Sequence, residues 1–328
     1  MKKALIFIAE LVFTLAVIAI ILALVDVQKV VQTLENANPY FFIAAALAYF
    51  MIAMIMAFRL KYILQGMGHK VSMASIAVSN FAGLLLADFT PARSGYLATA
   101  LMVSAKEKIP IEKTSVAILA PQLFEFLLKV SMGGVALVYV AMQFSEGEMG
   151  SMLGLGASVV IVFGMLIFGV LLLFSKRFLR MLSLLERIPF FGKYGYGLLK
   201  KMHENTLAVK RLIPFILTLL LFGWAFKSLE WVLLANCIGM EPNTALPPIV
   251  FYAFFQPLIT LLQFIPTPTL AGIGLSEAGA AAVFMLFGVP PHQSITFLLL
   301  TRADTIAINL IGIQEARQAM KKYMSRLF

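Results

Sequence analysis

Charged side chains are scarce in this 328-residue sequence: 13% of its residues are Asp, Glu, Lys or Arg, whereas 61% are hydrophobic. A soluble domain has about 25% charged and about 45–50% apolar residues, so the composition excludes an ordinary water-soluble protein. Runs of roughly 20 apolar residues recur along the chain, and each can cross a ~30 Å hydrocarbon core as a helix. We therefore expect an all-α polytopic membrane protein, a single membrane domain over residues 1–328 with no soluble domain.

Cysteine and histidine are also rare. The single cysteine, Cys237, excludes an intrachain disulfide and a thiolate metal site, and His69, His203 and His292 have no metal-ligand spacing. No Walker motif, HExxH motif or Ser-His-Asp arrangement stands out, so we expect no metal, no cofactor and no enzymatic activity. The net charge of +10 comes from short basic segments between apolar runs, which favours membrane topology over nucleic-acid binding.

Six apolar runs are long enough to be full membrane spans. The first exceeds the ~7–15 residues of a signal-peptide core and is read as a membrane helix. The predicted spans are 4–25, 39–60, 115–144, 151–174, 212–238 and 290–313.

Two further apolar regions, 72–104 and 249–288, are interrupted by proline and glycine. Each is left with arms too short to span comfortably, and a broken backbone persists in a membrane only where protein or a water-filled cavity satisfies it. Both regions are therefore expected to be re-entrant helical hairpins with tips inside the molecule. The residues expected to gate at these tips are Pro91, Gly95, Pro266, Pro268, Gly272 and Gly274.

The charges of the loops predict the orientation. Basic loops belong in the cytoplasm, which places both termini inside and makes the two hairpins enter from opposite sides. Residues 39–144 and 212–313 then each have the order span, hairpin, span, which is an inverted-topology repeat. Residues 175–211 form a basic cytoplasmic connector between the repeats, and the short loops indicate the plasma membrane of a prokaryote.

Nine charged residues lie within these hydrophobic regions. At ~2.5–3.5 kcal/mol for each lipid-facing charge, they must instead face a polar interior. Spacings of four and three residues predict two ion pairs, Glu125–Lys129 and Lys227–Glu230. The nine residues are Asp88, Arg93, Glu125, Lys129, Lys227, Glu230, Glu277, Arg302 and Asp304.

Their roles remain open between structure and function. The two pairs are equally compatible with locking helix packing and with binding substrate. For Arg93 and Arg302 we favour a functional role, because a guanidinium beside helix ends in a broken region can hold a phosphate. Asp88 either caps the hairpin tip or belongs to the site, and Glu277 either caps a helix through Ser276 or reaches the cavity.

Around both hairpins the sequence resembles the flippase-like family of the lysylphosphatidylglycerol synthase transmembrane region. The matching residues are Pro91, Arg93, Gly95, Pro266, Gly272, Gly274, Glu277, Gly288, Val289, Arg302 and Asp304. It departs from the family pattern at Tyr96, where an acid is usual, and at Gln122, where an arginine often stands. The resemblance implies movement of a lipid headgroup across the bilayer. The soluble aminoacyltransferase domain of the full synthases is expected to be absent.

The function expected from these observations is that of a lipid flippase. An anionic or aminoacylated phospholipid, or a polyprenyl-phosphate-linked headgroup, would cross through a polar cavity between the repeats. The expected partners are membrane lipids and a separately encoded lipid-synthesising enzyme. The alternatives are an ion-coupled transporter of a small soluble anion and, less favoured, an intramembrane lipid-modifying enzyme.

Overall fold

The computed structural model describes residues 26–144, 210–262 and 275–324. Within these ranges every regular element is a helix and no β-strand occurs, which confirms the all-α class. The elements in chain order are α2 (Val27–Glu35), α3 (Pro39–Gly66), α4 (Met73–Asp88), η1 (Pro91–Leu97), α5 (Ala98–Glu107), α6 (Ile111–Phe144), η2 (Lys210–Leu212), α11 (Ile213–Cys237), α12 (Pro248–Leu262), α13 (Leu275–Leu286), α14 (Pro291–Asn309), η4 (Leu310–Gly312) and α15 (Ile313–Met324).

Four helical stretches among the described residues are long and apolar enough to cross a membrane: α3, α6, α11 and the continuous stretch from α14 into α15. The shortest, α11, has 25 residues, which at 1.5 Å per residue is about 37 Å and exceeds a ~30 Å hydrocarbon core. These four stretches correspond to predicted spans, so the chain is a multi-pass membrane protein. The predicted spans 4–25 and 151–174 lie outside the described residues.

The first predicted hairpin consists of α4, a break and α5. With 16 residues, α4 is about 24 Å long and too short to span. At the break, the Thr90 hydroxyl donates to the carbonyl oxygen of Leu86 (2.9 Å) and accepts from the N–H of Gly95 (2.6 Å). A Cβ at Gly95 would lie 2.4 Å from the same carbonyl oxygen, so only glycine fits. The interruption predicted from Pro91 and Gly95 is confirmed.

The second predicted hairpin is described only in its arms, α12 and α13. Its four predicted gating residues, Pro266, Pro268, Gly272 and Gly274, lie outside the described residues. The described arms are 15 and 12 residues long, and neither could span alone.

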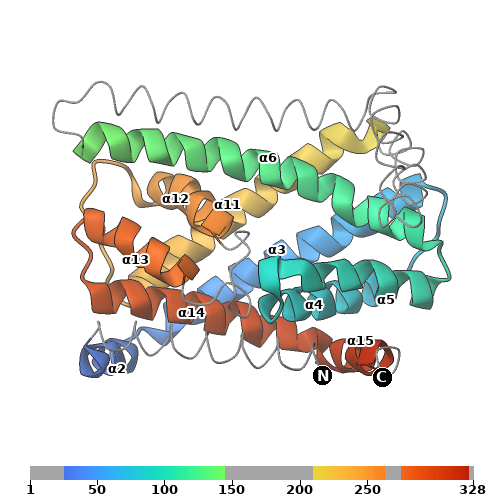
Figure 1. The fold of residues 1–328 in the computed structure, drawn as a ribbon, viewed down its shortest axis with the longest axis horizontal. Helices are drawn as coiled ribbons and strands as arrows, with labels where there is room; N and C mark the ends of the chain where they lie inside the picture. The colour runs from blue at the N-terminus through green and yellow to red at the C-terminus, as the bar shows by residue number, and fades with distance from the viewer. Residues whose placement is uncertain (1–25, 145–209, 263–274, 325–328) are drawn as a thin grey trace, which may run out of the picture.

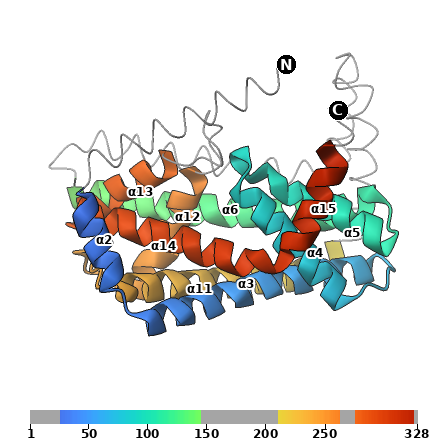
Figure 2. The ribbon, with the colours of Figure 1, turned by 90° about the horizontal axis from the view of Figure 1, so that it is seen from below.

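The long helices surround the two pairs of short ones. Figure 1 shows α3 and α11 running side by side along a diagonal behind the centre, with α6 and α14 along opposite edges. The pair α4 and α5 lies at the end where α3 finishes and α6 begins, while α12 and α13 lie at the other end, where α11 finishes and α14 begins. Seen from below, α2 and α15 lie at opposite ends of α14 (Figure 2).

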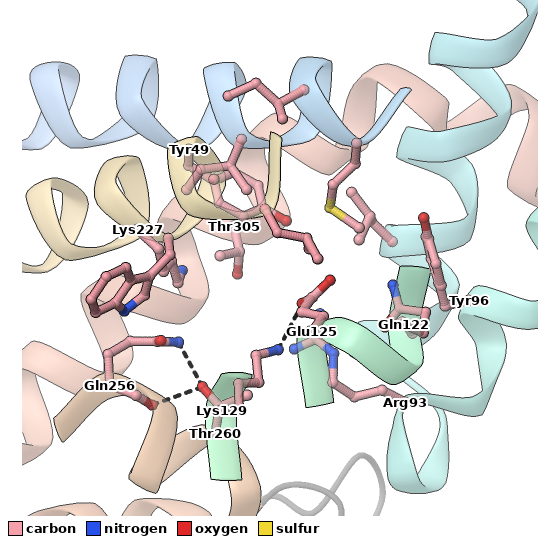
Figure 3. Close-up of a pocket in the computed structure, with 18 of the residues that line it drawn as sticks. Tyr49, Arg93, Tyr96, Gln122, Glu125, Lys129, Lys227, Gln256, Thr260 and Thr305 are labelled. Carbon is pink, nitrogen blue, oxygen red and sulfur yellow. Dashed lines mark hydrogen bonds and ion pairs between the residues drawn. The ribbon is translucent and has the colours of Figure 1, made fainter. Parts of the chain in front are cut away.

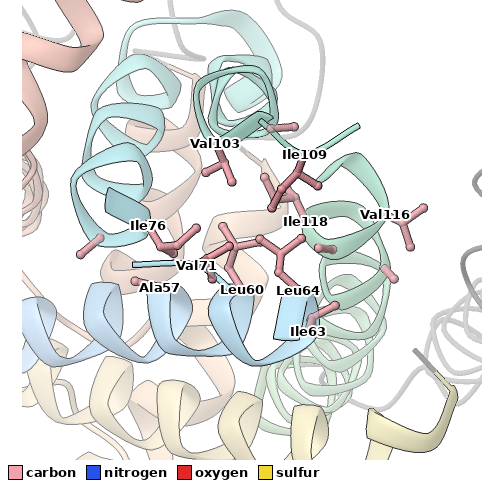
Figure 4. Close-up of a cluster of buried hydrophobic side chains, with 14 of the residues drawn as sticks. Ala57, Leu60, Ile63, Leu64, Val71, Ile76, Val103, Ile109, Val116 and Ile118 are labelled. Carbon is pink, nitrogen blue, oxygen red and sulfur yellow. The ribbon is translucent and has the colours of Figure 1, made fainter. Parts of the chain in front are cut away.

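Each pair of short helices packs into its own apolar core. The first core joins α3, α4, α5 and α6 through aliphatic side chains such as Leu60, Ile76 and Val103 (Figure 4). The second is aromatic: Phe251 stacks on Phe255 with ring centroids 4.3 Å apart, and both contact Phe287 edge-on. The polar site lies between these two cores.

Gly312, in η4, lies directly against the backbone of α4. A Cβ at this position would be 2.1 Å from the backbone nitrogen of Ala82. Gly312→Ala should therefore push α14 and α15 away from α4 and lower the free energy of unfolding by about 1–3 kcal/mol. Unfolding of the purified protein by SDS in micelles measures this. Gly223→Ala is the matched control, because a Cβ there meets nothing within 4 Å; equal stability of the two variants would contradict the prediction.

Candidate functional site

A cavity of about 450 Å³ opens in the middle of the molecule. Its walls come from α3, α4, η1, α6, α11, α12 and α14, so both hairpin regions and all four long helices contribute. In the view of Figure 3, Arg93, Tyr96 and Gln122 lie on one side and Lys227, Gln256 and Thr260 on the other. Glu125 and Lys129 of α6 lie between these two groups.

The charged side chains of the lining are mostly basic. Among the described residues, five basic and two acidic side chains face the cavity, which is a formal net charge of +3 for this part of the lining. The bases are Arg59, Arg93, Lys129, Lys227 and Arg302, and the acids are Asp88 and Glu125. Six of the nine predicted site residues therefore line one cavity, and the other three, Glu230, Glu277 and Asp304, do not line it.

Both ion pairs predicted from helical spacing are present. The Lys129 ammonium lies 2.8 Å from a carboxylate oxygen of Glu125. The Lys227 ammonium donates to both oxygens of Glu230, at 2.6 and 2.9 Å. Lys227 also lies 5.2 Å from the centre of the Tyr49 ring, within cation–π range. Each lysine is thus held at the cavity wall by an acid of its own helix.

Arg59 is a site residue that sequence reasoning missed. It stands at the end of the predicted span 39–60 and is absent from the nine charged residues predicted to face the interior. Because α3 continues to Gly66, Arg59 lies inside the helix; it is 4% exposed. Its guanidinium is 3.6 Å from the carboxylate of Glu125. Glu125 therefore balances two cations, Arg59 and Lys129.

Asp88, the last residue of α4, joins α4 to α14. One carboxylate oxygen lies 3.2 Å from the Arg93 guanidinium, and the other accepts from the side-chain amide of Asn309 at 2.8 Å. Asn309 and the Tyr49 hydroxyl are also hydrogen-bonded. Asp88 thus lines the cavity, while the hydrogen bonds at the break are made by Thr90.

The backbone of Arg93 adopts a φ of +54°, a conformation that non-glycine residues rarely adopt. Such a conformation costs on the order of 1–3 kcal/mol and persists where the surroundings enforce it, often at functional positions. Arg93 lies in the break between α4 and α5 and its side chain lines the cavity. The unusual backbone conformation distinguishes it from the other basic residues of the lining.

On the opposite wall, Arg302 of α14 forms an ion pair with Glu277 of α13. Glu277 does not line the cavity, as one of the two possibilities for it required; its carboxylate contacts Arg302, which does. Asp304, two residues along α14, is fully buried. The charge of Arg302 is thus balanced by Glu277, and this ion pair joins α13 to α14.

A proline-freed carbonyl shapes the polar wall of α12. Pro257 lies inside this helix, so the carbonyl of Ala253 loses its helical partner. The indole N–H of Trp224 donates to that oxygen at 2.8 Å. Beside it, the Gln256 amide donates to the Thr260 hydroxyl at 2.6 Å, and both side chains line the cavity. Sequence reasoning missed these groups, although a proline within an apolar run signals a freed carbonyl.

The two departures from the family pattern both face the cavity. The Tyr96 hydroxyl donates to the side-chain oxygen of Asn80 at 3.0 Å, and Asn80 in turn donates to the carbonyl of Ala53. Tyr96 thus ties η1 to α4 and α3. Within the described residues, no group of three or more His, Cys, Asp or Glu is placed to hold a metal ion.

Comparison with known proteins supports the resemblance seen in the sequence. The family model of the lysylphosphatidylglycerol synthase TM region matches residues 7–312. A curated relative, the glycosyltransferase AglD of Haloferax volcanii, is 24% identical over 151 residues, which is 46% of this chain. The match covers only about a quarter of that relative's length. Because the family model covers nearly the whole chain, this protein belongs to the family of the lysylphosphatidylglycerol synthase transmembrane region.

Proposed function

We propose that this protein is a lipid translocase that moves an anionic headgroup across the bilayer. The observation that carries the proposal is a cavity of about 450 Å³ with five bases and two acids in its lining. This volume lies within the ~300–1,000 Å³ of typical ligand sites and suits a headgroup without its chains. A phosphate or phosphodiester would be held by Arg93 and Arg302, with Lys129 and Lys227 adding positive charge.

Alternating access would come from an inverted repeat. The described elements repeat the order long helix, short pair, long helix, and Figure 1 shows the two short pairs at opposite ends of the molecule. We propose that residues 39–144 and 212–313 are the two repeats, that their hairpin tips gate the cavity, and that both termini are cytoplasmic. The proposed basic connector, residues 175–211, lies almost wholly outside the described residues.

The lipid chains would stay in the bilayer through a lateral opening. Membership of the lysylphosphatidylglycerol synthase transmembrane family supports a lipid as the ligand. The lipid we propose on this ground is phosphatidylglycerol, either aminoacylated or unmodified. The glycosyltransferase relative supports a glycan-bearing headgroup instead, for which we propose a polyprenyl phosphate as the lipid carrier. Both share a phosphate beside a long apolar chain. We propose that the chain only moves such a lipid and that a separate enzyme synthesises it.

The basic residues of the cavity should be required for lipid binding. We expect a distinct phospholipid or polyprenyl phosphate to co-purify with the wild type and to be lost in Arg93→Gln and in Arg302→Gln. Lipid movement in liposomes should also fall at least about tenfold in each variant, because each loses one charged contact with the headgroup. Mass spectrometry identifies the lipid. Lys70→Gln is the matched control, because Lys70 is an exposed base away from the cavity.

A soluble anion is the second candidate, since the same cationic lining would hold free phosphate or a carboxylate. If only bulk lipid co-purifies, unchanged by either substitution, and the reconstituted protein transports a soluble anion, the lipid assignment is wrong. Product formation from lipid substrates by the purified chain would instead show an enzyme.

A further inference from the structure

Asp304 is a buried acid without a visible counter-ion. Its side chain is fully buried in α14, and neither carboxylate oxygen has a hydrogen-bond partner among the described residues. An isolated carboxylate in such surroundings is so unfavourable that the group takes up a proton instead. The other four acids predicted for the site all have basic partners: Asp88, Glu125, Glu230 and Glu277.

The charges around Asp304 do not compensate it. Its electrostatic neighbours are Glu230 and Lys227 of α11, and both oxygens of Glu230 already accept from Lys227. One ammonium therefore faces two carboxylates. On the other elements that pack against α14, several ionisable groups have partners of their own: Glu277 with Arg302, Asp88 with Arg93 and Asn309, Tyr49 with Asn309, Arg59 with Glu125, and Lys29 with Asp26. The remaining ionisable groups on these elements are Glu35 of α2 and Tyr40, Lys61 and Tyr62 of α3.

We propose that Asp304 and Glu230 form a proton-binding pair that is coupled to anion binding through Lys227. In the empty site, one proton on Asp304 and the Lys227 ammonium balance the two acids. When Lys227 turns toward an anionic headgroup in the cavity it lines, Glu230 loses its partner and takes up a second proton. The headgroup then enters together with one proton, and both are released together. This inference rests on the proposed function for its anion.

The first test needs no lipid. The Asp304 carboxyl is protonated in the folded protein and ionised in the unfolded protein. The stability that this group contributes to the wild type should therefore be present at low pH and be lost as the pH rises. Asp304→Asn cannot ionise and keeps the shape of the protonated acid. The melting temperature of the variant should therefore fall less than that of the wild type between about pH 5 and about pH 9. Asp88→Asn changes an acid that has partners, so the melting temperature of this variant should fall over the same pH range as much as that of the wild type.

The second test uses short-chain phosphatidylglycerol as the probe. Linkage of one proton predicts that its Kd for the wild type rises by up to about tenfold per pH unit, with proton uptake on binding in weak buffer. Glu230→Gln, which removes the acid that takes up the second proton, should flatten this dependence, whereas Asp304→Asn, which mimics the protonated acid, should keep it. If Asp304→Asn melts with the wild-type pH profile, there is no proton on Asp304 and the inference is wrong, whatever the protein transports. Binding that takes up no proton would overturn the coupling. No binding at any pH would instead count against the anionic phospholipid of the proposed function, and the coupling would fall with it.

Discussion

Gly223→Trp is expected to abolish lipid movement while leaving the protein folded. Gly223 lines the cavity on the face of α11 that also carries Leu220, Trp224 and Lys227. A Cβ there meets no atom within 4 Å, so a larger side chain would extend into open space. An indole would fill much of the volume that a headgroup needs. Because glycine disfavours a helix interior, the substitution should also stabilise α11 slightly, by roughly 0.5 kcal/mol.

The measurement is lipid movement in liposomes beside the free energy of unfolding in micelles. A size series of Ala, Leu and Trp at Gly223 should lower transport stepwise to the rate of protein-free liposomes. Leu221→Trp is the matched control, since Leu221 is exposed on the same helix and lines no part of the cavity. Full transport by folded Gly223→Trp would show that the headgroup does not pass through this cavity.

Glu125→Ala should have the largest effect on stability among the ion-pair substitutions. Its carboxylate lies 2.8 Å from Lys129 and 3.6 Å from Arg59, and the Arg59 side chain is only 5% exposed. Removing one partner of a buried pair costs about 3–5 kcal/mol because the remaining charge is uncompensated. We expect roughly 3 kcal/mol, at the lower end, because the Glu125 side chain is itself 22% exposed and water screens the loss.

A double substitution separates charge from packing. Arg59→Gln combined with Glu125→Gln removes the buried cation together with its partner, so it should recover a large part of the stability lost in Glu125→Gln. Lys129→Ala should cost less than Glu125→Ala, because Arg59 still balances the acid. SDS unfolding measures all four variants. If Glu125→Ala and Lys129→Ala are equally stable, Arg59 does not depend on Glu125.

Features set by neighbouring residues in the chain could be predicted from the sequence. The four described spans follow from apolar runs longer than the bilayer core. The break in the first hairpin follows from Pro91 and Gly95, whose backbone requirements are local. The pairs Glu125–Lys129 and Lys227–Glu230 follow from helical spacing, since residues three or four apart share a helix face. Each of these could be read within a short window of sequence.

Features that depend on which helix faces meet were decided only by the tertiary structure. Arg59 was absent from the charges predicted to face the interior, because its partner Glu125 lies 66 positions away on another helix. The hydrogen bond from Asn309 to Asp88 joins residues 221 positions apart, and no periodicity signals it.

The sequence by itself therefore determined a helical membrane protein with charges that must avoid lipid. The nine charged residues that it placed inside the hydrophobic regions are five acids and four bases, whose charges nearly cancel. The packing of the helices placed five bases and two acids on the cavity wall and put Glu230, Glu277 and Asp304 behind it. Side-chain direction depends on helix rotation and crossing, which composition and spacing along one helix do not specify.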